Sequence, residues 1–250
     1  MMLKSIKKSL FLVQLILLIV VNGLTVKEVQ ASSNENEKVL IIISSDSRGY
    51  WLPEVVEPYY LLEKAGFQID VASPKGGAGK ASGTRRLKHS YKKWLKKSKL
   101  SRQLENAIPL AEVESSKYRA VYVAGGAGPM FDLIDNAQAQ NVIRDIYEAG
   151  GLVSADCHGP AALLNVRLSD GQRLIEGRKV TAKANIEEGR WARSNYPFLL
   201  ENKMQELGAI YSAAAKNHPH VVVDGRLITG QNPASAIPVA ESLITALQNR

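Results

Sequence analysis

The feature that most limits the fold of this chain is the stretch 152–164, which reads LVSADCHGPAALL. Two apolar residues and a short polar run lead to Cys157, the only cysteine in the sequence. His158, a Gly-Pro pair and a second apolar run follow. A buried strand that ends at a nucleophile and turns at once into a helix is the plan of a nucleophile elbow. The stretch therefore predicts an α/β fold with Cys157 at the carboxyl end of a central strand.

The predicted turn also bears on the reactivity of Cys157. A helix that begins just after the thiol directs free backbone N–H groups and a positive dipole end toward it. We therefore expect Cys157 to lose its proton more readily than a free cysteine, and the thiolate is the reactive form. The alternative is a small buried hydrophobic residue without chemistry. The Gly-Pro turn and the adjacent His158 favour the reactive interpretation.

Apolar patterns in the rest of the chain predict one large domain. The run 39–43, VLIII, is apolar throughout, as in a parallel strand covered on both faces. A helix at 53–65 and a strand at 67–72 follow it, which predicts a right-handed βαβ unit. Further strands are expected at 120–124, 152–155 and 209–213, a peripheral strand or hairpin at 174–182, a hairpin at 221–229, and helices at 136–148, 198–207 and 234–247. This order predicts a flavodoxin-like three-layer sandwich, with a mostly parallel central sheet and helices on both faces.

A glycine-rich loop follows the expected strand at 120–124. It begins Gly125-Gly126-Ala127 and lacks the Lys-Ser/Thr continuation of a phosphate-binding P-loop. Its backbone N–H groups are instead expected to bind an oxyanion beside Cys157, the alternative being a tight turn without a ligand. One cysteine excludes an intrachain disulfide, and the four histidines have no metal-binding spacing, so no metal site is expected.

Residues 1–31 have the parts of a secretory signal peptide. Lys4, Lys7 and Lys8 form a basic region, residues 10–21 are apolar apart from one glutamine, and Ala31 offers a cleavage point. We expect export to the periplasm or the medium, with a polar leader at 32–38 and the folded domain at 39–250. An uncleaved membrane anchor is the alternative.

The segment 75–102, called the basic insert below, differs in composition from its surroundings. It has eleven Lys or Arg and no Asp or Glu, which gives it a charge of +11. Because the whole chain has a net charge of +8, the residues outside the insert have a net charge of −3. The insert could contact an anionic membrane face or another polyanion. The alternative is a solvated, poorly ordered surface segment whose first part is made flexible by glycines. Because it lacks interleaved aromatic residues for base stacking, no specific nucleic-acid partner is expected.

Several motifs together resemble one family. They are Gly66-Phe67 with the strand up to Ser73-Pro74, Leu104-Glu105-Asn106 with Ile108-Pro109, the strand and loop 118–126, the Cys157-His158-Gly159-Pro160 turn, and the hairpin and loop 222–233. The chain is similar in these to the ThiJ/PfpI superfamily, which has the class I glutamine amidotransferase-like fold. Within it, the chain looks most like the heat-shock chaperone and glyoxalase III branch, over residues 39–247.

The resemblance implies a set of site residues. The nucleophile falls on Cys157 and its adjacent histidine on His158. A first-helix glutamate falls on Glu54, with Glu57 as the fallback, and the acidic residue that orients the histidine falls on Glu188, with Glu187 second. Gly125 and Gly126 would supply oxyanion N–H groups, together with Ala127, which stands where the branch usually has histidine.

One departure from the branch lies beside the nucleophile. The branch usually has an apolar residue before the cysteine, and here it is Asp156. A negative charge at this position would oppose thiolate formation, unless the carboxyl points away or is paired.

The function that the resemblance implies is that of a cofactor-independent glyoxalase III-like lyase of the D-lactate dehydratase type. It would convert methylglyoxal or a related 2-oxoaldehyde to a 2-hydroxy acid and form a homodimer. The alternatives are a cell-envelope stress chaperone or oxidation sensor, and a PfpI-type peptidase. Glutaminase activity is disfavoured, because His218 and His220, the late histidines, lack the required spacing.

Overall fold

The computed structural model describes residues 38–250. The predicted signal peptide and residues 32–37 of the polar leader lie outside the described residues, so the expectations about them remain expectations. None of the helices in the described part of the chain has both the length and the apolar character needed to cross a membrane.

A seven-stranded sheet forms the centre of the domain. Its strands are β1 (Lys38–Ile42), β3 (Gln68–Ser73), β5 (Ile108–Pro109), β6 (Tyr118–Val123), β7 (Leu152–Asp156), β10 (Val221–Asp224) and β11 (Leu227–Gly230). They lie in the order β10-β11-β7-β6-β1-β3-β5, and every neighbouring pair is parallel except the β10–β11 hairpin. The mostly parallel sheet predicted from the apolar runs is therefore confirmed.

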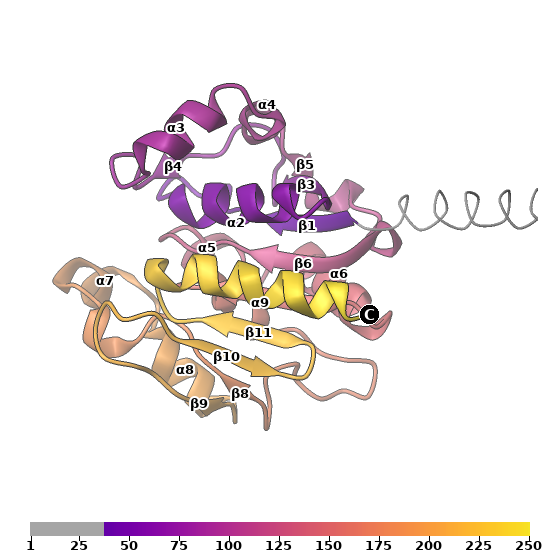
Figure 1. The fold of residues 1–250 in the computed structure, drawn as a ribbon. Helices are drawn as coiled ribbons and strands as arrows, with labels where there is room; N and C mark the ends of the chain where they lie inside the picture. The colour runs from indigo at the N-terminus through magenta and orange to yellow at the C-terminus, as the bar shows by residue number, and fades with distance from the viewer. Residues whose placement is uncertain (1–37) are drawn as a thin grey trace, which may run out of the picture. The chain divides into compact units, whose positions relative to one another are not determined.

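Helices cover both faces of this sheet, as Figure 1 shows. Helices α2 (Pro53–Lys64) and α9 (Ala236–Gln248) pack together on one face, and α6 (Ala137–Glu148) covers the other. Val39, Ile41 and Ile43 join the core under α2 and α9, whereas Leu40 and Ile42 join the core under α6. Successive strand residues point to opposite faces, which explains why this run is apolar at every position.

The remaining helices are shorter. They are α3 (His89–Leu95), α4 (Lys99–Glu105), α5 (Pro129–Asp132), α7 (Arg190–Asn195) and α8 (Leu200–Glu206), with short 3₁₀ turns between elements. Local signals account for several boundaries. The Asn136 side chain caps α6 by accepting the Ala139 N–H at 2.9 Å, and Pro53 occupies the first turn of α2, where its missing N–H does no harm.

The strand or hairpin predicted at 174–182 is wrong in detail. Only β8 (Lys179–Val180) forms there, and it pairs in parallel with β9 (Ile210–Tyr211) in a separate two-stranded sheet. Leu174 and Ile175 lie in a turn segment and are fully buried in the core that also holds Leu200 and Met204. Their apolar character thus serves packing against α8 and does not mark a strand.

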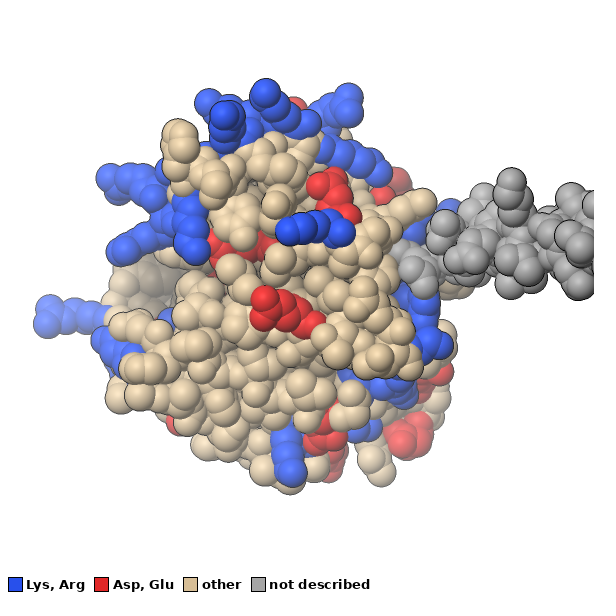
Figure 2. Space-filling model, in the orientation of Figure 1, with Lys and Arg blue, Asp and Glu red and all other residues tan. Residues whose placement is uncertain are grey.

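The basic insert is structured. Its glycine-rich first part, expected to be flexible, contains β4 (Ala81–Ser82), which pairs with β2 (Tyr50–Trp51). Its second part forms α3 and the start of α4, where Leu100 is fully buried and Trp94 lies 5.2 Å from the Tyr60 ring of α2. Buried apolar anchors therefore hold the insert over α2, and Figure 2 shows its lysines and arginines projecting from this side of the molecule.

Candidate active site

Cys157 occupies a strained turn at the carboxyl end of β7. Its φ angle is +54°, a left-handed conformation that is unusual for a residue with a side chain. The turn is fixed on both sides, because the Cys157 N–H donates to the Gly230 carbonyl at 2.9 Å and the Cys157 carbonyl accepts from the Lys183 N–H at 2.8 Å. This geometry is that of the predicted nucleophile elbow. The element that follows, Gly159–Leu163, is a 3₁₀ helix and not the expected α-helix.

His158 lies between the thiol and a carboxylate. Its Nδ1 atom is 3.5 Å from the Cys157 sulfur, and its Nε2 atom is 2.8 Å from Glu188 Oε1. The His158 and Glu188 side chains are 8% and 3% exposed, so this pair is shielded from water. A carboxylate on Nε2 fixes the ring orientation and stabilises the imidazolium that forms when Nδ1 takes a proton. The three residues therefore have the arrangement that a nucleophile, a base and an orienting acid require.

Glu187 has a different set of partners. Its Oε1 atom accepts from the Asn217 N–H at 2.6 Å and from the Asn232 side chain at 2.9 Å, and its Oε2 atom lies 3.2 Å from Lys183 Nζ. The choice between the two glutamates that the sequence left open is thereby settled by contact, since Glu188 and not Glu187 touches His158.

Lys183 is a site residue that the sequence interpretation missed. Burial would favour its neutral form, but the Cys157 sulfur when ionised and the Glu187 carboxylate, 3.2 Å away, raise the pKa of its ammonium group. Lys183 therefore stays cationic close to the sulfur. It lies 26 positions from Cys157 in no recognisable motif, and only the hydrogen bond between the two backbones brings it to the elbow.

Glu54 lies against Cys157 across the glycine loop. A Cβ atom placed on Gly125 would come within 2.5 Å of Glu54 Oε2 and 2.7 Å of the Cys157 Cβ, so only glycine fits between them. Glu54 is completely buried, and neither of its carboxyl oxygens has a hydrogen-bond partner of normal geometry among the described residues. Glu57, the fallback residue, lines a cavity of about 540 Å³ with Trp51 and Arg86.

The electrostatics correct the expectation of a readily ionised thiol. Burial raises the pKa of Cys157 well above its ordinary value, the charge of Glu54 adds to the increase, and the Lys183 cation opposes it. Burial also raises the pKa of the Glu54 carboxyl well above its usual range, and the charge of Asp156 raises it further. Desolvation thus outweighs the turn and favours the protonated forms of both the thiol and the carboxyl.

Burial opposes a second negative charge at Asp156, beside the thiol. The Asp156 side chain is fully buried next to Tyr122 of β6, and burial raises the pKa of its carboxyl well above its usual range. No described residue hydrogen-bonds to its carboxyl oxygens in normal geometry. Such an environment favours the neutral carboxyl, which reduces the repulsion expected from an acidic residue at this position.

The glycine loop presents backbone N–H groups next to the elbow. Within residues 38–250, the N–H groups of Gly126, Ala127 and His158 donate no hydrogen bond. Gly126 has a φ angle of +111°, and a Cβ there would lie 2.5 Å from the Trp51 nitrogen, so the loop conformation requires glycine. The Gly125 N–H faces the buried carboxyls of Glu54 and Asp156. Of the predicted oxyanion donors, Gly126 and Ala127 therefore remain available.

An aromatic wall adjoins His158. The Tyr196 ring meets the His158 ring edge-on at 5.0 Å, and Phe131 and Trp191 lie 5.8 Å and 5.6 Å from Tyr196. Trp191 is 52% exposed, so it stands at the outer edge of the wall. Arg48 stacks over Phe131 at 3.5 Å.

No group of three or more His, Cys, Asp or Glu in the described part of the chain is arranged to hold a metal ion.

Known proteins resemble this chain over most of its length. The glutathione-independent glyoxalase hsp3102 of Schizosaccharomyces pombe is 29% identical over 80% of this chain and 89% of its own length. The crystal structure of glyoxalase III from Candida albicans has a TM-score of 0.78 at 27% identity and covers 85% of this chain and 98% of its own. The rapid encystment protein of 24 kDa from Francisella tularensis has a TM-score of 0.79 at 33% identity, and the match covers 84% of this chain and 99% of that protein's chain.

The model of the DJ-1/PfpI family matches residues 37–246, which is nearly all of the described domain. The resemblance drawn from the motifs is thus confirmed, and the chain belongs to the DJ-1/PfpI family.

Proposed function

We propose that this protein is a glyoxalase III-type enzyme that converts methylglyoxal or a related 2-oxoaldehyde to a 2-hydroxy acid without glutathione. The observation that carries the proposal is the meeting of Cys157, His158, Glu188 and Glu54 at one strand end. The relatives named as glutathione-independent glyoxalases support the same reaction class. A covalent nucleophile and a carboxyl beside it are the two groups that this isomerisation needs.

The first step is addition of the sulfur to the aldehyde carbon. His158 Nδ1, at 3.5 Å, takes the thiol proton as the C–S bond forms, and Glu188 stabilises the resulting imidazolium. The aldehyde oxygen then receives this proton, which gives a neutral hemithioacetal. While negative charge resides on that oxygen, the N–H groups of Gly126 and Ala127 are placed to stabilise it.

The second step moves hydrogen between the two substrate carbons. A neutral Glu54 carboxyl donates its proton to the ketone oxygen while its other oxygen takes the hydrogen from the hemithioacetal carbon, which yields an enediol. The carboxyl then returns a hydrogen to the neighbouring carbon and recovers one from the first hydroxyl. The product is a 2-hydroxy thioester on Cys157, and water cleaves its C–S bond to release lactate and the free thiol. Glu54 stays neutral throughout, in keeping with its burial.

The test is lactate formation from methylglyoxal by the purified protein without glutathione. Cys157→Ala and Glu54→Gln should each abolish turnover. Glu57→Gln is the matched control, because it makes the same change one helical turn away, at a carboxyl for which no contact with Cys157 or His158 is found among the described residues. Lactate formation at the wild-type rate by either the Cys157 or the Glu54 variant would refute the proposal.

We also propose that the protein is exported, on the strength of the basic and apolar regions within residues 1–31. A homodimer is proposed by analogy with the family. Intact mass of the protein from the periplasm or medium would test cleavage near Ala31, and sedimentation would test the dimer. The full-length mass in a membrane fraction would favour the anchor instead.

The basic insert is proposed as a contact surface for anionic membranes. Its lysines project from α3 and the adjoining loops, over a scaffold anchored by Leu100 and Trp94. Cosedimentation with vesicles that contain anionic lipid, compared with neutral vesicles, tests this. Equal binding to both kinds of vesicle would contradict it.

A further inference from the structure

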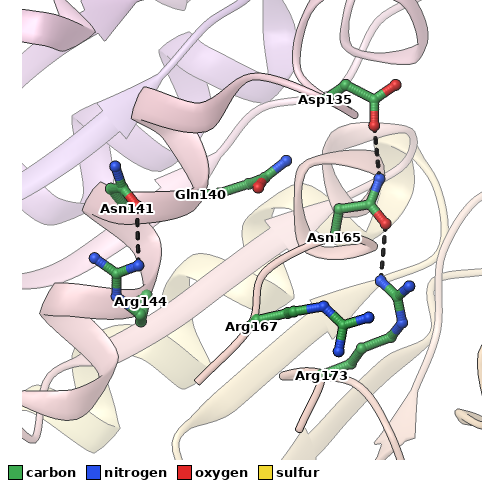
Figure 3. Close-up of a pocket in the computed structure, with 7 residues that line it drawn as sticks. All are labelled: Asp135, Gln140, Asn141, Arg144, Asn165, Arg167 and Arg173. Carbon is green, nitrogen blue, oxygen red and sulfur yellow. Dashed lines mark hydrogen bonds between the residues drawn. The ribbon is translucent and has the colours of Figure 1, made fainter. Parts of the chain in front are cut away.

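A polar cavity lies outside the candidate active site, and none of its lining residues belongs to that site. It has a volume of about 330 Å³ and lies between two segments (Figure 3). Helix α6 contributes Gln140, Asn141 and Arg144, and the chain after the elbow helix contributes Asn165, Arg167 and Arg173. We call it the arginine cavity.

Two of its arginines are held next to each other by the backbone. Arg167 and Arg173 face each other in an isolated antiparallel bridge, and Figure 3 shows their guanidinium groups adjacent at the cavity. Like charges directly opposite each other across such a bridge repel. Within residues 38–250, neither guanidinium has a carboxylate within 4.0 Å. No carboxylate of the described chain lies close enough to pair with either guanidinium, whereas an anion in the cavity could contact both.

The hydrogen bonds leave the cavity with a surplus of donors. Arg167 uses one nitrogen, Nη1, to reach the Gly171 carbonyl at 2.9 Å. Arg173 uses its Nη1 for the Leu164 carbonyl at 2.9 Å and for Asn165 Oδ1 at 2.8 Å. An arginine has five N–H donors, so most of those on both side chains remain for a ligand.

The opposite wall adds donors and little further positive charge. Arg144 is paired with Asp145 at 2.8 Å and donates to Asn141 Oδ1 at 2.9 Å, which leaves the Asn141 NH₂ group without a partner among the described residues. The one carboxylate of the lining, Asp135, accepts from Asn165 at 2.8 Å. The ligand that fits must therefore be anionic and accept hydrogen bonds from two sides.

We propose that the arginine cavity binds a small phosphate, either inorganic phosphate or a phosphate monoester. A planar carboxylate is satisfied by one guanidinium fork, whereas a tetrahedral phosphate offers acceptor oxygens to both walls at once. The cavity, at about 330 Å³, is large enough to admit either ligand. The site is independent of the proposed glyoxalase chemistry, so failure of one leaves the other standing.

The test is titration calorimetry of the full protein with inorganic phosphate, glycerol phosphate and lactate, at constant ionic strength set with chloride. Arg167→Gln should weaken phosphate binding by about tenfold or more, since it removes a charge-assisted fork. Asp135→Asn should strengthen binding, because it removes the only carboxylate of the lining. Arg190→Gln, the same change at an exposed arginine of α7 that is not part of the cavity lining, is the matched control and should bind as the wild type does.

Each outcome decides the matter. Binding that depends on Arg167 and not on Arg190 supports the site, and whichever of inorganic phosphate and glycerol phosphate binds more tightly identifies the source of the phosphate group. The proposal is overturned if the wild type binds no phosphate, if Arg167→Gln binds it equally well, or if lactate binds as tightly as phosphate.

Discussion

His158 Nε2 lies 2.8 Å from Glu188 Oε1, and this contact joins residues 30 positions apart in a site from which water is nearly excluded. It fixes the imidazole so that Nδ1 faces the Cys157 sulfur at 3.5 Å. The contact matters because the thiol does not ionise readily on its own. Burial raises its pKa, so a correctly oriented base must remove the proton when substrate is present.

The first prediction concerns this base. Glu188→Gln keeps the size of the side chain and removes the charge that stabilises the imidazolium, so kcat for methylglyoxal should fall by about 10²-fold. Stopped-flow measurement of substrate loss checks it. Glu187→Gln is the comparison, since Glu187 does not touch His158, and its kcat should fall less. Equal losses in both variants would contradict the assigned roles.

The second prediction concerns the reactivity of Cys157. Because its pKa is raised, alkylation by iodoacetamide should be slow at neutral pH and should accelerate as the pH rises above the ordinary range of a thiol. Lys183→Met removes the cation that opposes this shift and should move the labelling profile to still higher pH. Mass spectrometry of labelled protein gives the rates. Lys179→Met, which changes an exposed lysine of β8, is the control. A labelling profile unchanged by Lys183→Met would show that the Lys183 charge does not act on the sulfur.

The third prediction concerns stability and pH. Asp156 has a raised pKa in the folded state, so the native protein holds a proton that the unfolded chain releases at lower pH. The stability linked to this proton is complete below the unfolded pKa, near 4, and is lost as the pH rises through the folded pKa, at about 1.4 kcal/mol per pH unit for one group. Between pH 5 and pH 8, the free energy of unfolding of Asp156→Asn should therefore decrease less steeply with pH than that of the wild type. Urea titrations at several pH values measure this, and a slope equal to the wild-type slope would count against a buried neutral Asp156.

The fourth prediction concerns Gly125. Gly125→Ala places a Cβ 2.5 Å from Glu54 Oε2 and 2.7 Å from the Cys157 Cβ, so one of these side chains must move. We expect loss of turnover and a decrease in stability of about 1–3 kcal/mol, as for overpacking. Gly189→Ala is the control, since no atom lies within 4 Å of its added Cβ. Retained activity in Gly125→Ala, read from lactate formation and thermal melts, would mean that the loop tolerates the displacement.

Much of the fold was predictable because each core strand carries a local signal. The uniform apolar run of β1 indicates burial on both faces, and the Asp224-Gly225 turn marks the β10–β11 hairpin. The prediction of a strand or hairpin at 174–182 was wrong in detail because Leu174 and Ile175 are apolar residues of a buried turn. Apolar character alone does not distinguish a strand from such a turn. The motifs also led to Cys157, His158 and Glu54, which the fold brings together.

The sequence by itself determined the elbow, the glycine loop and the kinds of residue that meet there, because turns and buried strands have local residue requirements. Three matters were decided only by the tertiary structure. They are the choice of Glu188 over Glu187, the presence of Lys183, and the neutral forms of Cys157, Glu54 and Asp156. Contact and desolvation depend on which distant segments pack around a group, and the same packing converts the activated thiolate expected at Cys157 into a buried thiol that needs His158.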